Sequence, residues 1–234
     1  MKILFITPYI TSACHPAFLR NQTGFGYMVH DIAQYVAKTE EVDIFATMAF
    51  TPKMEVDGFK VVGRSKWSLL RNLSLKNLLD GFRFINRYSM PLKESLRTLY
   101  IFAAIGQVEH IMKQYDVVHI HGCSSITDAV IKACKRQNIP FLVTLHGLNS
   151  FEKLIKLHSS LCRYERDFLK EAVTNHYPVS FISTGNILTV EAATGKTADS
   201  FRVICNGCNV ERKPMKVDIR KEYEIGRASC RERV

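Results

Sequence analysis

The sequence predicts an α/β protein, with a Rossmann-like parallel sheet that carries helices on both faces. Three observations support this fold class. Short apolar runs rich in β-branched residues recur along the chain, segments with helical periodicity separate them, and a first strand, a glycine-containing loop and a first helix follow one another at the start. Because parallel strands need long crossover connections, this alternation indicates βαβ units rather than hairpins.

Seven runs are expected to form the strands of this sheet. Each is short and apolar along most of its length, as is typical of strands that are buried on both faces of a parallel sheet. The runs are residues 2–7, 41–47, 59–63, 116–121, 140–146, 179–184 and 201–205.

The clearest helix follows Gly24. Its apolar residues recur at a spacing of three or four, which predicts one face packed on the sheet. These residues are Phe25, Met28, Val29, Ile32 and Val36. Further helices are expected at about 95–113, 124–137, 150–172 and 185–193.

Composition sets limits on class and on partners. The 234 residues, 47% of them hydrophobic, are enough to bury a substantial core. We find neither an apolar run long enough to cross a bilayer nor a signal peptide, and therefore expect a cytoplasmic protein. The net charge of +10 favours anionic partners such as nucleotide phosphates, nucleic acid or an acidic membrane face. An ordinary solvated surface explains such a charge equally well.

Ligands of a parallel sheet bind outside the carboxyl ends of its strands, so candidate residues are sought there. Gly24 and Gly26 lie where the first helix should begin, and the backbone N–H groups of that turn could receive a phosphate. A plain strand-to-helix turn would use the same glycines. The segment "TGFGYM" lacks the third glycine of the dinucleotide fingerprint, which argues against a nicotinamide cofactor.

Histidines follow two of the expected strands. His146 ends an apolar strand and precedes Gly147, so its imidazole could hydrogen-bond a sugar hydroxyl or a phosphate; a backbone carbonyl could equally cap it. His119 and His121 share one face of a strand and Cys123 follows, which raises the question of a metal. No second cluster with ligand spacing accompanies them, and we expect no metal.

Two further segments imitate known sites. The segment Lys66–Arg87 mixes apolar side chains with lysines and arginines, as helices that lie in a membrane interface do. The alternative is an ordinary helix packed on the sheet. The segment "TGKT" at 194–197 imitates a phosphate-binding loop, but Val190 stands where that motif requires glycine, and we reject it.

Five segments together resemble a known family. "MKILFITPY", "TGFGYMVHDIAQYVAK", "YDVVHIHG", "IPFLVTLHG" and "FRVICNGCNVE" are similar, in order and spacing, to the amino-terminal domain of retaining glycosyltransferases of the B fold. That group includes glycogen synthases and mannosyltransferases. The resemblance implies two Rossmann-like domains that hold a nucleotide-sugar between them, with no metal or other cofactor.

The resemblance also implies roles for particular residues. Gly24 would present backbone N–H groups to the donor diphosphate, and Gly26 would shape that loop. His146 would be the catalytic residue, reaching the transferred sugar or the charge that develops beside it. His121 would help to line the acceptor side.

The same resemblance divides the chain into three parts. Residues 1–205 would form the amino-terminal, acceptor-side domain, and 206–223 a hinge at Asn206 and Gly207 followed by the start of a carboxyl domain. Residues 225–234 back-translate to a reading frame that resembles a common sequencing adapter. We therefore expect 224–234 to be a non-native tail, and the native chain to continue beyond Tyr223 into a second domain.

The expected function is transfer of a sugar, with retention, from a nucleotide-sugar donor to a sugar or lipid-linked acceptor. The present chain alone is expected to be inactive. Peripheral contact with the inner membrane face would use Lys66–Arg87, and no nucleic-acid partner is expected. Two alternatives stay open: a nucleotide-sugar epimerase of the same fold, and a non-enzymatic module that binds membranes or nucleic acid.

Overall fold

A computed structural model describes residues 1–12, 18, 23–48, 50–151 and 159–205 of the chain. Its strands are β1 (Lys2–Thr7), β2 (Glu41–Ala46), β3 (Met54–Val56), β4 (Phe59–Val61), β5 (Val117–His121), β6 (Phe141–Leu145), β7 (Val179–Phe181) and β8 (Phe201–Val203). Its helices are α1 (Gly24–Val36), α2 (Lys66–Arg71), α3 (Leu75–Tyr88), α4 (Leu92–Glu109), α5 (Ser125–Gln137), α6 (Ser159–Thr174) and α7 (Thr184–Thr194), with a short 3-10 turn η2 (Met112–Gln114).

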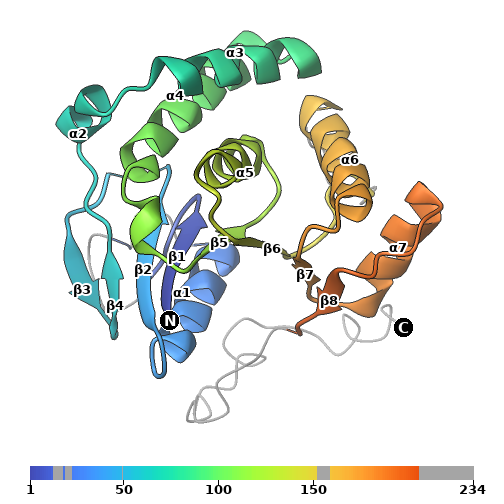
Figure 1. Cartoon of the computed structure of the whole chain (residues 1–234), viewed down its shortest axis with the longest axis horizontal. Coiled ribbons are helices and arrows are strands. Elements are labelled where there is room, and N and C mark those ends of the chain that lie inside the picture. Colours follow the sequence, from blue (N-terminus) through green and yellow to red (C-terminus); the bar gives the residue numbers. More distant parts are fainter. Residues whose placement is uncertain (13–17, 19–22, 49, 152–158, 206–234) are drawn as a thin grey trace, which may run out of the picture.

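The strands form one sheet in the order β3-β4-β2-β1-β5-β6-β7-β8 (Figure 1). Neighbouring strands are parallel except for the antiparallel pair β3–β4. The chain moves outward from β1 through β2 to β4 and then returns to the other side of β1 at β5. The α/β prediction with a Rossmann-like, mostly parallel sheet is therefore confirmed.

The helices cover both faces of this sheet. Successive side chains of a strand point to opposite faces, so Ile3 and Phe5 of β1 pack with Val29 of α1 in one core cluster. Leu4 and Ile6 belong to a second cluster, which α4, α5, α6 and α7 also build. The sheet thus has one face for α1 and one for the later helices.

Most predicted elements are confirmed, but β3 was missed. The predicted strand 59–63 is the second arm of a hairpin, in which β3 pairs with β4 across Asp57 and Gly58. Both turn residues have positive φ, 49° and 88°. An Asp-Gly pair between two apolar runs is a known sequence signal for such a turn.

The helical predictions were wrong at two places. The helix expected at 150–172 is described over Ser159–Thr174, and its predicted start is wrong because residues 149–151 form a turn; 152–158 lie outside the described residues. The segment Lys66–Arg87 is two helices, because Ser74 has extended backbone and caps the start of α3. Helix α3 packs on α4, α5 and α6 (Figure 1), so the alternative of a helix on the sheet is also wrong.

Arg136, on α5, ties three of these helices together. Its Nε donates to Glu109 Oε1 at 2.8 Å, its Nη1 to Asp80 at 2.9 Å and its Nη2 to Asn77 Oδ1 at 2.6 Å. The side chains of Arg136, Asp80 and Glu109 are only 17%, 13% and 19% exposed. Removing one member of such a partly buried network leaves the others without a counter-charge.

We expect Arg136→Met to lower the free energy of unfolding by about 2–4 kcal/mol, because Asp80 and Glu109 lose their partner in a partly buried site. Urea denaturation at pH 7 measures this loss. The matched control is Arg83→Ala, which also removes a partner of Asp80 but at a side chain that is 76% exposed. That control should cost less than about 1 kcal/mol. Equal losses for the two variants would contradict the assignment.

Candidate functional site

The carboxyl ends of β1, β5 and β6 meet the start of α1 at one edge of the sheet. The ring of Phe25, in the first turn of α1, lies edge-on to the ring of His146, with 5.1 Å between ring centroids. The backbone N–H of Thr11 donates to the carbonyl of Gly26 at 3.4 Å. The glycine turn and the strand-end imidazole, which the sequence analysis singled out separately, therefore lie at the same edge.

The two glycines of this turn have different surroundings. A Cβ at Gly26 would overlap the side-chain oxygen of Thr11, so the close approach of the loop that follows β1 requires glycine there. A Cβ at Gly24 would meet no heavy atom of the described residues within 4 Å. Thr23 caps the helix by accepting the N–H of Gly26 at 3.0 Å. Gly24 thus has no close neighbour in the part of the chain that the structure describes, whereas Gly26 is fixed by packing.

His121 and His146 form a hydrogen-bonded pair across β5 and β6. His121 Nδ1 lies 3.3 Å from His146 Nε2, and the two ring planes differ by 4°. The register, which sets His121 opposite Thr144, explains the pairing because His146 follows two residues later on the same face. His121 is only 1% exposed. It therefore lies behind His146 and presents almost no surface of its own.

A second polar chain runs beside this pair. His119 Nε2 lies 2.6 Å from Thr144 Oγ1, which in turn lies 2.6 Å from Ser180 Oγ on β7. The rings of His119 and His121 are 4.2 Å apart. In the parts of the chain that the structure describes, no three His, Cys, Asp or Glu side chains are grouped so as to hold a metal ion. We call His119, His121, Thr144, His146 and Ser180 the polar row.

Burial keeps the imidazoles of the polar row uncharged. It lowers the pKa of His146 to about 4. Burial, aided by the neighbouring His146, lowers the pKa of His119 to about 3. The pKa of His121 is also well below its usual value, for the same reason. At pH 7 each ring is therefore neutral and carries one N–H donor and one acceptor nitrogen.

The loop after His146 is held from α6. Glu165, which is 2% exposed, accepts the backbone N–H groups of Asn149 and Ser150 at 3.2 and 2.5 Å. Arg166 Nη2 donates to the carbonyl of Ser150 at 2.9 Å. Among the described residues, a Cβ at Gly147 would meet nothing within 4 Å. The loop is thus held at Asn149 and Ser150, whereas no described residue crowds its backbone at Gly147, next to His146.

Several residues of this site were not predicted from the sequence to be site residues. Phe25 was assigned to the sheet-facing stripe of α1 but also contacts His146. Ser180 and Glu165 are recognisable only once strand register and helix packing are known. The predicted hinge residues Asn206 and Gly207 lie outside the described residues. Gly195 ends α7 with φ of 67°, in agreement with the rejection of "TGKT" as a phosphate loop.

Comparison with known proteins shows the family and the fold of the chain. A family model described as Glycosyltransferase Family 4 matches residues 23–212. The solved structure of sucrose-phosphate synthase from Thermosynechococcus elongatus is similar to the chain, with a TM-score of 0.58 and 15% sequence identity. The match covers 96% of this chain and 53% of that one, so this chain spans about half the length of the solved structure. At this identity the likeness shows the fold alone.

A search of curated protein sequences finds no match to this chain. The family model, however, extends from the cap of α1 through the polar row to residues beyond β8, which is most of the chain. The chain therefore belongs to Glycosyltransferase Family 4.

Proposed function

We propose that this chain forms the first of two domains of an enzyme that transfers a sugar from a nucleotide-sugar to an acceptor with retention. Family membership supports glycosyl transfer over the epimerase alternative. The observation that carries the proposal is that His146 and the open side of Gly24 lie at one edge of the sheet. The second domain would supply the opposite wall, and without it we expect no transfer.

The start of α1 is suited to the donor diphosphate. Helix N-termini carry a partial positive charge and expose backbone N–H groups. Thr23 uses the N–H of Gly26, and the first turn contains no acidic residue that would repel an anion. Because Gly24 has no Cβ and no described residue crowds the place of one, a phosphate could approach its backbone closely.

His146 would contribute a hydrogen bond rather than a charge. Its pKa of about 4 leaves the ring neutral at pH 7. Because Nε2 faces His121 and Nδ1 is buried, a hydrogen bond to a sugar hydroxyl or a leaving oxygen would require one of these nitrogens to be uncovered. A neutral imidazole cannot itself compensate the charge that develops on the diphosphate. That compensation would come from the helix terminus, whose dipole is fixed before the reaction begins. The proposal requires no metal or other cofactor.

A second surface supports a peripheral contact with anionic lipid, which suits a lipid-linked acceptor. Helix α3 buries the stripe Asn77, Gly81, Phe84 and Tyr88. On the opposite side it exposes a second apolar stripe. This stripe consists of Leu75, Leu79 and Phe82, which are 73%, 47% and 51% exposed. An apolar stripe that faces away from the core is not explained by packing within this domain.

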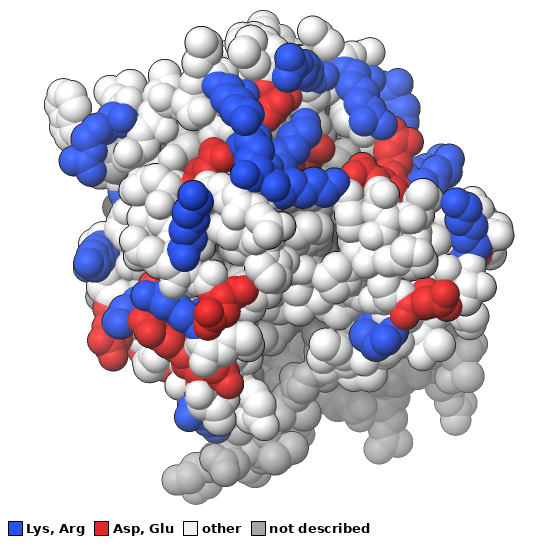
Figure 2. Space-filling model, in the orientation of Figure 1, with Lys and Arg blue, Asp and Glu red and all other residues white. Residues whose placement is uncertain are grey.

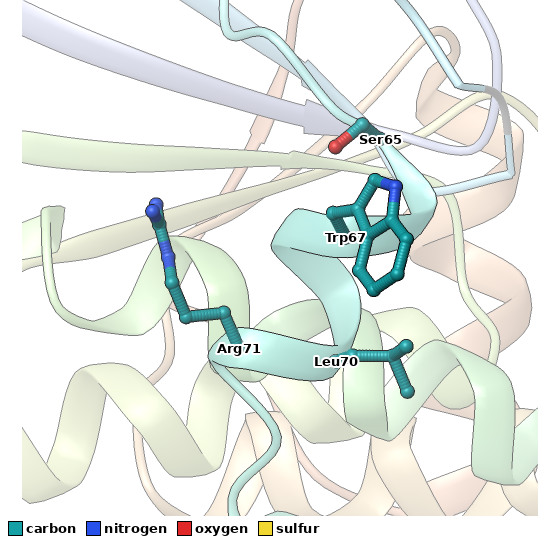
Figure 3. A pocket seen from close by; sticks show the side chains of 4 residues that line it. All are labelled: Ser65, Trp67, Leu70 and Arg71. Atoms are coloured by element: carbon teal, nitrogen blue, oxygen red, sulfur yellow. The ribbon is translucent and has the colours of Figure 1, made fainter.

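Basic residues accompany this stripe. Lys and Arg side chains lie along the edge of the molecule where α3 lies, with acidic side chains among them (Figure 2). Next to it, Trp67 and Leu70 project from the same side of α2, whereas Arg71 points away from them (Figure 3). Trp67 is 81% exposed. In the described parts of the chain no helix is long and apolar enough to cross a membrane, so the contact proposed is with the surface of the bilayer.

The glycine turn gives a paired test of the donor site. In the two-domain protein we expect Gly24→Ala to raise the KM for the nucleotide-sugar at least about tenfold, because its Cβ enters the space proposed for the diphosphate. Its urea denaturation should match that of the parent. Gly26→Ala is the contrasting variant, and its collision with Thr11 should lower the free energy of unfolding by about 1–3 kcal/mol. An unchanged KM in Gly24→Ala would contradict the proposed donor site.

The outward stripe of α3 predicts selective binding to acidic vesicles. We expect the chain to cosediment with phosphatidylglycerol vesicles more than with phosphatidylcholine vesicles, and less at high salt. Leu75→Gln should weaken this binding several-fold. The matched control is Leu188→Gln on α7, a leucine that is 60% exposed but lies outside the stripe. Equal effects of the two substitutions, or no preference for the acidic vesicles, would refute the membrane contact.

A further inference from the structure

The imidazole pair of β5 and β6 contains two ring nitrogens that are not used in the pair. His121 Nε2 and His146 Nδ1 are both buried, and neither has a hydrogen-bond partner among the described residues. The inner nitrogens, His121 Nδ1 and His146 Nε2, face each other at 3.3 Å. The pair thus has one hydrogen bond between its rings and one remaining nitrogen on each side.

One hydrogen bond between two neutral rings couples their tautomers. Each neutral imidazole has one hydrogen, on Nδ1 or on Nε2. If His121 donates from Nδ1, His146 Nε2 is the acceptor, and the hydrogen of His146 must be on Nδ1. If His146 donates from Nε2, His121 Nδ1 accepts, and the hydrogen of His121 must be on Nε2. The two rings therefore always have the same tautomer.

The surroundings hold the two rings in this arrangement. Phe5 lies against both His119 and His121, with ring centroids 4.8 and 5.0 Å apart. Phe25 lies edge-on to His146. His119 is hydrogen-bonded to Thr144 through Nε2. Aromatic side chains from β1 and α1 therefore pack against the two rings of the pair.

We propose that His121 is a positioning residue that determines which ring nitrogen of His146 carries the hydrogen. With both hydrogens on Nδ1, the buried Nδ1 of His146 carries an N–H; with both on Nε2, it carries a lone pair. This inference rests on the proposed function only for its consequence in catalysis, since the coupling itself is a property of the folded chain. It gives His121 a different role from the predicted one of lining the acceptor side, which stays a prediction.

The coupling can be measured without any activity. In the chain labelled with ¹⁵N-histidine, two-bond proton–nitrogen correlation spectra at pH 7 distinguish the N–H nitrogen of each ring from the one with the lone pair. We expect His121 and His146 to show the same tautomer. Opposite tautomers in the two rings would place two hydrogens or two lone pairs between them, and would overturn the proposal.

Variants separate this positioning role from general stability. His121→Leu removes the partner and should change the tautomer population of His146. His121→Asn retains a hydrogen-bonding amide near the position of Nδ1 and should restore a single tautomer. The matched control is Thr144→Val, which breaks the neighbouring contact with His119 but leaves the pair intact. An unchanged His146 spectrum in His121→Leu would overturn the proposal.

In the two-domain enzyme the same variants test the catalytic consequence. We expect His121→Leu to lower kcat about tenfold or more with little change in the donor KM, and His121→Asn to recover most of that loss. If the tautomers are coupled but the completed protein transfers no sugar, the proposed function fails while the pairing stands. If transfer occurs and His121→Leu has the kcat of the parent, the positioning role is refuted.

Discussion

The register of β5 between β1 and β6 determines which side chains meet at the carboxyl edge of the sheet. It sets Phe5 opposite His119 and His121 opposite Thr144. Polar side chains are thereby buried on the face that α1 covers, in a position where an unpaired charge would be costly. The pKa values of the three histidines fall accordingly, and hydrogen bonds between neighbouring strands take the place of solvation.

The rest of the domain supports this edge from both faces. On one face the loop after β1 lies against Gly26, and the first turn of α1 brings Phe25 onto His146. On the other, α6 holds the loop after β6 through Glu165. The result is a preorganised edge with a helix terminus and a neutral imidazole side by side. Those two elements are what the proposed transfer reaction needs from this domain.

Much of this arrangement was predictable from sequence, because it depends on local patterns. The apolar runs and the stripe after Gly24 predicted the strands and α1, and strand-end position identified Gly24 and His146. What depends on register or on contacts between elements was not predictable, such as the burial of His121 behind His146 and the part that Ser180 plays. The break between α2 and α3 was also missed, since the amphipathic pattern continues through Leu73 and Ser74.

The most direct measurement is the titration of the His146 ring by NMR between pH 8 and pH 3. The ring is expected to stay neutral down to about pH 5 and to take up a proton with a pKa of about 4, because burial at the edge of the sheet disfavours the charged form. A pKa close to that of a free imidazole, about 6.5, would show that the ring is solvated and not part of this wall. The proposed site would then be without its central residue.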